Sequence, residues 1–530
     1  MNVRVIRQPL AGSPLAEVFM RGEAPDAWYE PRPDGPIAWR ARLEEIRSSF
    51  AKDWLSRLAP AIAATGEAAE RLQAAAEGHG VVVTTGQQPG LFGGPIYTLS
   101  KALSALAFAN ALQEVTGIPV APVFWAATDD ADFKEASSTV IAVSGGAQLL
   151  RIDHTESLGR TMDSMPLGEV SAELDALSHS AGSASDRTPL EMLQRYYTPR
   201  ATIGSAYVSF LRELFDPLGI SVIDASHPAT REAARPVLKS ALEKSREIAE
   251  ALKARNGEIE AAGFSPQVQD VPGLSLVFNS GPGGRKRIPL KASGGHTTDG
   301  EMGPNVLLRP VVERAVLPTA AYLGGPAEIA YFAQIAPIAD ALGVARPLIL
   351  PRWSCTILES HVEQILEKLY LLPEDFRDPH EVEGRVARAR LPKAVIEELR
   401  TTRAMLDERL DALSQAVTRE QAPVSPAVTG GLRANLTRRL DRFERRIVAA
   451  VKSKHADVMH DIATARGSLY PFGKPQERSL NFVPLLARYG KNLRDQMLED
   501  ASSYAKALVS GKKRARASAP RARQSARGNP

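Results

Sequence analysis

The chain has 530 residues, of which 44% are hydrophobic and 24% are charged, which is typical of a folded protein with room for two or three domains. Its formal net charge of +4 comes from residues 511–530, which hold seven Lys and Arg and no acid; without those seven charges the remainder carries −3. No run approaches the roughly 20 apolar residues of a membrane span, and the first residues lack the apolar core of a signal peptide. The single cysteine, Cys355, excludes an internal disulfide and a multi-cysteine zinc site. We therefore expect a cytoplasmic protein with a disordered basic tail at 511–530, for which solvation is a simpler explanation than nucleic-acid binding.

The first strand and its following turn come after a helical region at 36–77. Val81–Thr85 is an apolar, β-branched run typical of a buried strand, and the glycine-rich turn 86–94 separates it from a helix that opens at Pro95. Backbone N–H groups and a helix N-terminus converge on an anion in such a junction, and Lys101 can reach the same place. A plain turn between two core elements explains the pattern at least as well, because neither the dinucleotide nor the P-loop fingerprint is present.

A second strand, Pro122–Thr128, follows this helix, so the two strands predict a parallel βαβ unit. Ligands bind beyond the carboxyl ends of the strands in such sheets. Polar residues stand there twice: Thr85–Gln88 after the first strand, and Asp129, Asp130 and Asp132 after the second. The aspartates suit a Mg²⁺ ion, a substrate amine or the N-cap of the next helix, and capping or hydrogen bonding is the simplest of these.

The middle of the chain continues to alternate between helices and strands. We expect, in order, a helix over 188–215, a strand at 220–225, a long helix over 232–262, and a hairpin with strands at 274–279 and 287–291. The hairpin loop carries Arg285, Lys286 and Arg287. It suits either a phosphate clamp or an exposed turn, and we favour the exposed turn.

A second glycine junction comes later, after predicted strands at 306–309 and 319–323. Gly324-Gly325-Pro326 leads from the latter strand into a helix with Glu328 in its first turn, which repeats the design of the first junction. Both glycine pairs permit close approach of backbone to a ligand. A last strand at 347–350 precedes Arg352, and Cys355 is predicted to lie in the core at the start of an apolar helix.

The composition changes near residue 380. Apolar residues at 396–417 and again at 436–450 follow heptad spacing, with a Pro- and Gly-containing break at 421–431 between them. This predicts an antiparallel helical hairpin over 381–467, which either folds on itself or pairs with a second copy. The segment 468–510 is predicted to return to the core, which occupies 1–380.

Several of these segments together resemble one family, the cysteine-adding ligases of bacillithiol biosynthesis (BshC). The resemblance rests on Thr85–Gly90 and Gly93–Thr98, Pro122–Trp125, Asn305–Pro310, Gly324–Pro326 with Glu328, Ile329 and Tyr331, Leu350–Arg352, and Pro475–Arg478. It implies a Rossmann-like parallel-sheet core, similar to nucleotidyltransferases and class I synthetases, with an inserted antiparallel coiled-coil domain used for homodimerisation. It also implies a ligase that joins L-cysteine to glucosaminyl-malate through an amide. Family members have a histidine in the acidic turn where this chain has Ala131, so that histidine's role is open here.

On this basis we expect Asp130, Asp132 and Lys101 to be catalytic. The remaining candidates are expected to bind substrate or nucleotide: Thr85, Gly86, Gln87, Gln88, Gly93, Gly94, Tyr97, Asp129, Arg309, Gly324, Gly325, Glu328 and Arg352. The two arginines suit the malate carboxylates. An acyl-adenylate made from ATP with Mg²⁺ would activate the cysteine carboxylate, although the chain lacks a HIGH sequence, and no residue spacing suggests a zinc site.

Two other functions fit the same sequence. One is an ATP-dependent ligase or nucleotidyltransferase with another amine acceptor. The other is a non-catalytic coiled-coil scaffold with a nucleic-acid-binding tail, which predicts that deletion of 511–530 abolishes function. Polar clusters at the ends of several predicted strands favour an enzyme, because a purely structural sheet does not require them.

Overall fold

The computed structural model describes residues 2–153, 159–281, 284–290, 301–378 and 380–511. The chain forms two compact units: Met1–Ile141, Leu149–Ile357 and Glu477–Pro530 make the first, and Ala142–Gln148 with Leu358–Gln476 make the second. The predicted basic tail lies outside the described residues, apart from Gly511. The helical unit therefore begins before residue 381, where the sequence placed it, and also takes in a short segment from within the first half of the chain.

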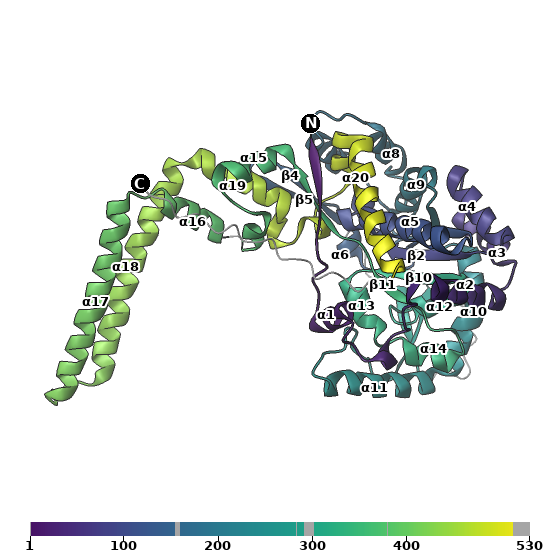
Figure 1. The fold of residues 1–530 in the computed structure, drawn as a ribbon, viewed down its shortest axis with the longest axis horizontal. Helices are drawn as coiled ribbons and strands as arrows, with labels where there is room; N and C mark the ends of the chain where they lie inside the picture. The colour runs from purple at the N-terminus through teal and green to yellow at the C-terminus, as the bar shows by residue number, and fades with distance from the viewer. Residues whose placement is uncertain (1, 154–158, 282–283, 291–300, 379, 512–530) are drawn as a thin grey trace. The chain divides into compact units, whose positions relative to one another are not determined.

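Five parallel strands form the centre of the first unit, in the order β11-β10-β2-β3-β6; Figure 1 labels β2, β10 and β11 of this sheet. Their bounds are β2 (Val81–Gln87), β3 (Val120–Ala126), β6 (Ser221–Asp224), β10 (Thr319–Gly324) and β11 (Ile349–Pro351). Every residue of β3 and β10 is buried, as expected for parallel strands covered on both faces. The predicted α/β fold with a Rossmann-like sheet is confirmed.

Helix α5 (Ile96–Thr116) covers one face of this sheet and is buried along most of its length, because α20 (Val483–Val509) packs on its other side. Pro95 is its N-cap, so the helix starts one residue later than predicted. The region 36–77 is helical as expected, in three pieces: α2 (Gly35–Ser49), α3 (Trp54–Ile62) and α4 (Gly66–Glu77). The opposite face of the sheet carries a hydrophobic cluster that includes Trp54, Leu58, Val82 and Trp125.

Further helices of the first unit surround this core. They are α1 (Pro14–Arg21), α6 (Phe133–Ala136), α7 (Ser171–Ser180), α8 (Thr188–Tyr196), α9 (Ile203–Phe215), α10 (Pro228–Glu243), α11 (Ser245–Ala261), α12 (Arg309–Val316), α13 (Pro326–Phe332) and α14 (Ala336–Leu342). The single long helix predicted over 232–262 is therefore two helices, α10 and α11, which meet at Lys244. The residues predicted as one helix over 188–215 likewise form two, α8 and α9.

A small antiparallel sheet lies beside this core, in the order β8-β7-β9: β7 (Leu274–Gly281), β8 (Gly284–Pro289) and β9 (Glu301–Pro304). The predicted hairpin is thus present. The strand predicted at 306–309 is wrong. Asn305 accepts the N–H of Leu308 on its side chain (2.9 Å) and that of Arg309 on its carbonyl (2.9 Å), so the chain turns there and enters α12 with Pro310 in its first turn.

The helix start predicted at Cys355 is also wrong, because Cys355 opens the strand β12 (Cys355–Glu359). Its partner is β1 (Val3–Arg7), at the N-terminal end of the chain, and only this distant pairing makes the segment a strand. Cys355 is buried, as expected.

The second unit consists mainly of α15 (Ser360–Leu369), α16 (Glu381–Ala389), α17 (Lys393–Arg419), α18 (Pro426–Lys454) and α19 (Ala456–Leu469). Helices α17 and α18 run side by side as a long hairpin (Figure 1), which confirms the predicted coiled-coil fold. Gly430 and Gly431 lie inside α18 rather than in the turn. The loop between β4 (Ser138–Val143) and β5 (Gly146–Arg151) joins this unit, since Gly145 donates its N–H to Thr464 of α19 (2.9 Å). None of the helices in the described part of the chain is long and apolar enough to cross a membrane.

Candidate active site

A cavity of about 610 Å³ opens at the carboxyl ends of β2, β3 and β10, within the first unit. Its volume lies in the range of roughly 300–1,000 Å³ usual for small-molecule sites. The small sheet β8-β7-β9 supplies a further wall. Besides the backbone of Gly86 and Gly325, the polar residues that line it are Gln87, Gln88, Tyr97, Lys101, Asp129, Asp130, Glu135, Gln269, Arg285, Arg287, Asn305, Arg309, Tyr322, Glu328, Tyr331, Arg352 and Arg478.

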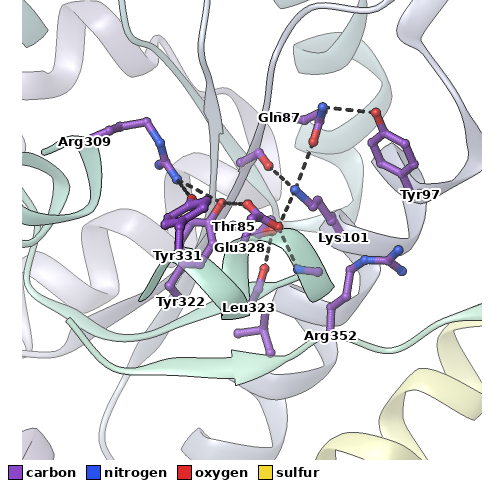
Figure 2. A network of polar contacts seen from close by, with 12 residues as sticks. Thr85, Gln87, Tyr97, Lys101, Arg309, Tyr322, Leu323, Glu328, Tyr331 and Arg352 are labelled. Carbon is purple, nitrogen blue, oxygen red and sulfur yellow. Dashed lines mark hydrogen bonds and ion pairs between the residues drawn. The ribbon is translucent and has the colours of Figure 1, made fainter. Parts of the chain in front are cut away.

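A buried ion pair between Lys101 and Glu328 stands at the centre of the cavity wall (Figure 2). The ammonium of Lys101 lies 2.8 Å from Glu328 Oε2 and also donates to the carbonyl of Gly86 (2.7 Å) and to Gln87 Oε1 (2.9 Å). Lys101 lies in the second turn of α5 and Glu328 in the first turn of α13, and these helices follow the adjacent strands β2 and β10. The two glycine junctions noticed in the sequence thus meet through these charged side chains.

The surroundings of this pair set its ionisation. Burial lowers the pKa of Lys101, and attraction to Glu328 offsets part of that effect. Burial alone would raise the pKa of Glu328, but the charge and hydrogen bond of Lys101, with hydrogen bonds from Tyr322 (2.5 Å) and the Gly325 N–H (2.6 Å), hold it below its ordinary value. Glu328 is therefore a carboxylate near neutral pH.

Arg309 extends the network on one side of this pair. Its guanidinium donates to the hydroxyls of Tyr322 (3.3 Å) and Tyr331 (3.2 Å) and forms an ion pair with the buried Glu313 (3.0 Å). Burial would lower the pKa of Arg309, but the neighbouring tyrosines and carboxylates raise it well above its ordinary value. The guanidinium is thus a fixed positive charge facing the cavity.

Gln87 extends the network on the other side. Its amide N–H group donates to Tyr97 Oη (3.1 Å) and to Glu135 Oε1 (3.3 Å), and Tyr97 Oη donates to the same Glu135 oxygen (3.1 Å). The Gln87 oxygen is already bound to Lys101, so its amide orientation follows from the hydrogen-bond partners. Enclosure by protein atoms raises the pKa of Glu135.

Asp129 and Asp130 lie together at the end of β3, opposite Arg285 of β8. The guanidinium of Arg285 is 3.5 Å from a carboxylate oxygen of each, and it stacks over Phe278 at 4.2 Å. Burial raises the pKa of Asp130, and its hydrogen bond from the Ala131 N–H offsets part of this. The exposed turn that we favoured is wrong for Arg285, whose side chain is only 9% exposed, because the two aspartates draw it into the wall.

Asp132 lies outside the cavity lining. It is the N-cap of α6 and accepts the N–H of Glu135 (3.2 Å), which is the capping role left open by the sequence. Asp132 thus starts the helix that carries Glu135.

Arg352 is buried at the end of β11 and forms a bidentate ion pair with Glu477, at 2.6 and 3.0 Å. Attraction to Glu477 outweighs burial and raises the pKa of Arg352. Its Nε–H is buried beside Gly325 and has no hydrogen-bond partner among the described residues. Arg352 therefore has one N–H donor that the described protein groups leave unused.

Four predicted binding residues lie outside the cavity lining. Thr85 Oγ1 donates to the carbonyl of Leu323 (2.8 Å) and so joins two strands. Gly93 donates its N–H to Tyr197 (3.0 Å) and packs against Phe210, in a space that a Cβ would fill. Gly94 donates to Leu91 (3.1 Å), and Gly324 packs against Ile349. The N–H groups of Gly93 and Gly94 are thus bound to protein, and that part of the turn shapes the backbone.

Sequence reasoning missed several polar cavity residues as site candidates: Glu135, Gln269, Arg285, Arg287, Asn305, Tyr322, Tyr331 and Arg478. The only local signal for Glu135 was its place three residues after Asp132, which reads as an ordinary cap pattern. Arg285 pairs across the fold, which no local pattern shows. Within the described part of the chain, no group of three or more His, Cys, Asp or Glu residues could hold a metal ion.

Comparison with protein families accounts for nearly all of the described chain. The model described as "Bacillithiol biosynthesis BshC, N-terminal Rossmann-like domain" matches residues 1–301 and 295–353, and "Bacillithiol biosynthesis BshC, C-terminal coiled-coil domain" matches 355–507. The chain belongs to the BshC family. The resemblance inferred from the sequence is therefore confirmed, and the BshC junctions Gly86–Gln88 and Gly325 with Glu328 are the ones that line the cavity.

Individual BshC relatives match over most of their length. A protein of Solibacter usitatus, named "Putative cysteine ligase BshC", is 30% identical over 433 residues, which cover 78% of this chain and 81% of the relative. Relatives with the same name from Koribacter versatilis and Chlorobaculum tepidum are 30% and 28% identical, over 79% and 80% of this chain and 82% and 81% of theirs.

Proposed function

We propose that this protein is a ligase that joins the carboxyl group of L-cysteine to the amine of glucosaminyl-malate and so forms bacillithiol. The observation that carries the proposal is the cavity of the first unit. At the edge of a Rossmann-like sheet, it is lined by several carboxylates and several cationic side chains of a BshC-family chain. Both substrates carry an amine and at least one carboxylate, and a cavity with charges of both signs suits them.

In this proposal Asp130 binds a substrate ammonium. Its raised pKa brings it closer to the range in which a carboxylate also accepts a proton effectively. Asp130 is preferred over Asp132, which caps α6. Arg309 and Arg352 line the cavity and are proposed to attract the malate carboxylates through their positive charges.

Amide formation needs an activated carboxylate, and we propose ATP with Mg²⁺ as the activator. An acyl-adenylate would release pyrophosphate when it forms and AMP when the amine attacks. The N–H groups of Gly93 and Gly94 already donate to protein atoms, so we do not place the phosphates at that part of the turn. We also propose that the protein is cytoplasmic and that it forms a homodimer through α17 and α18. The exposed apolar side chains of Met405, Leu413 and Phe443 on this hairpin support the homodimer.

The test is a mass-spectrometric assay of the purified full-length protein with cysteine and glucosaminyl-malate, with and without Mg-ATP. Formation of bacillithiol only when ATP is present would support all three assignments: glucosaminyl-malate as acceptor, cysteine as donor and ATP as activator. Product without ATP would remove the adenylate step alone, and no product under any condition would remove the assigned reaction. The same assay with other amines tests the alternative acceptor, and deletion of 511–530 tests the scaffold, because the ligase proposal expects no effect.

Replacing Asp130 with asparagine is expected to lower kcat/KM by about 100-fold or more, since the change removes a charge that binds and orients a substrate ammonium while preserving the side-chain shape. Steady-state rates of product formation measure this. Asp175→Asn, at an exposed position on α7, is the matched control and should behave as wild type. Equal rates for Asp130→Asn and wild type would contradict the role.

A further inference from the structure

Glu135 differs from the other carboxylates of the cavity in its partners. Asp129 and Asp130 face Arg285, and Glu328 is paired with Lys101. Among the described residues, no Lys or Arg lies within ion-pair distance of Glu135; Lys101 and Arg478 act on it only from farther away. Glu135 is a solvent-exposed residue of the cavity lining, and a carboxylate there that has no protein cation still attracts the cation of a ligand.

The hydrogen bonds of Glu135 leave one of its oxygens open. Tyr97 and Gln87 both donate to Oε1, at 3.1 and 3.3 Å, and no described group donates to Oε2. Glu135 lines the cavity, so Oε2 is the oxygen that a ligand can use. An ammonium group has only N–H donors, and one of them can bind a single carboxylate oxygen. A guanidinium, in contrast, binds best when both carboxylate oxygens are available.

Glu135 is held in place from three directions. Lys101 fixes the oxygen of Gln87, so the Gln87 NH₂ group has to face Tyr97 and Glu135. Figure 2 shows the hydrogen bonds from Lys101 to Gln87 and from Gln87 to Tyr97. The Asp132 cap fixes the first turn of α6, from which Glu135 projects. Such positioning lowers the entropy cost of orienting a bound amine for attack.

We propose that Glu135 binds the ammonium of the acceptor substrate through Oε2 and accepts its proton as the amide forms. This inference rests on the proposed function and assigns the acceptor amine to Glu135, which leaves Asp130 for the ammonium of cysteine. The deprotonated nitrogen attacks the carbonyl carbon of the cysteine acyl group activated by a nucleoside triphosphate. The C–N bond forms, the bond from that carbon to the phosphate oxygen breaks, and AMP leaves with the electron pair. The nitrogen loses two protons in all: the first, lost before attack, resides on Glu135, and the second leaves on the phosphate of AMP.

Two features of the site support this role. Enclosure by the protein raises the pKa of Glu135, which makes it a better proton acceptor near neutral pH than an ordinary carboxylate. Tyr97, whose own pKa is raised by burial, stays protonated and continues to donate to Oε1 when the charge of Glu135 changes. Glu135 is therefore stabilised as a carboxylate through one oxygen while the other meets the amine.

The test compares wild type with Glu135→Gln, which preserves size and an acceptor oxygen but removes the charge. Product formation measures kcat and KM for glucosaminyl-malate, cysteine-dependent exchange of pyrophosphate into ATP measures activation alone, and calorimetry measures binding of glucosaminyl-malate. Glu173→Gln is the matched control, because Glu173 is likewise in the first turn of a helix, α7, and lies away from the cavity. Circular dichroism and the exchange rate show whether each variant is folded.

For Glu135→Gln we expect kcat/KM for glucosaminyl-malate to fall by about 100-fold or more, with weaker binding and unchanged exchange. Glu135→Asp should recover part of the loss. Wild-type kcat/KM in Glu135→Gln, or an equal loss in exchange and product formation, would overturn the inference while leaving the proposed reaction in place. A wild-type protein that binds glucosaminyl-malate without forming product would remove the proposed reaction, and the binding comparison would then decide the ammonium site alone. A wild-type protein that does neither would remove both.

Discussion

Replacing Lys101 with methionine is expected to lower the free energy of unfolding of the first unit by about 3–5 kcal/mol. The change leaves the carboxylate of Glu328 without its cation in a site where the Lys101 side chain is only 5% exposed and that of Glu328 15%. It also removes the donors to Gly86 and Gln87. Product formation should be lost as well, because Gln87 would no longer be oriented toward Tyr97 and Glu135.

The cause can be separated from a general packing defect. Adding Glu328→Gln to Lys101→Met removes the unpaired charge, so the double variant should regain most of the stability but none of the activity. Lys506→Met is the matched control; Lys506 pairs with Glu114 at 3.0 Å, but both side chains are about 60% exposed, so the change should cost less than about 1 kcal/mol. A double variant less stable than Lys101→Met alone would contradict the argument.

All five tryptophans lie in the first unit, so tryptophan fluorescence during urea unfolding follows this unit specifically. They are Trp28, Trp39, Trp54, Trp125 and Trp353. This readout avoids the assumption that the whole chain unfolds in one step, which chains with two compact units often violate.

Replacing Arg352 with methionine is the second change with a large expected effect, again about 3–5 kcal/mol. Arg352 and Glu477 have side chains only 5% and 7% exposed, and Ser354 also donates to Glu477 (2.6 Å), so the carboxylate that remains would be buried without a cation. Arg352→Lys should lower the free energy of unfolding less than Arg352→Met does, because lysine preserves the charge. Some loss should remain, since lysine makes only one of the two parallel hydrogen bonds.

The chain contains a surface copy of this bidentate geometry. Arg346 meets Asp340 at 2.8 and 2.5 Å, with side chains 36% and 51% exposed. Arg346→Met should therefore change the unfolding free energy by less than about 1 kcal/mol. Similar losses for Arg346→Met and Arg352→Met would show that burial is not what makes the Arg352 pair important.

The strand–turn–helix junctions were predictable because their signals are local. Val81–Thr85 has a strand composition, Pro95 suits a helix start, and Gly324-Gly325-Pro326 repeats the pattern. The heptad spacing of the coiled coil is local in the same sense. Such patterns depend only on residues close together in the sequence, and the corresponding elements are present in the structure.

The partners of the charged residues were not predictable in this way. Lys101 meets Glu328 only because β10 lies beside β2 in the sheet, and Arg285 meets Asp129 only because the small sheet packs at the end of β3. Of the two wrong element assignments, only the one at β12 has this cause, because β12 becomes a strand by pairing with β1. The strand predicted at 306–309 failed for a local reason, since Asn305 turns the chain into α12. A single sequence contains no periodicity that reports such pairings.

The strand order has a consequence for how the chain is made on the ribosome. β2 is paired on one side with β3, which emerges soon after it, but its other neighbour, β10, is synthesised only after β3, β6 and the small sheet. During that interval β2 presents an open edge with unpaired backbone groups, which invites pairing with other nascent chains. Chains that stop before Thr319 should therefore depend on chaperones far more than the finished protein does.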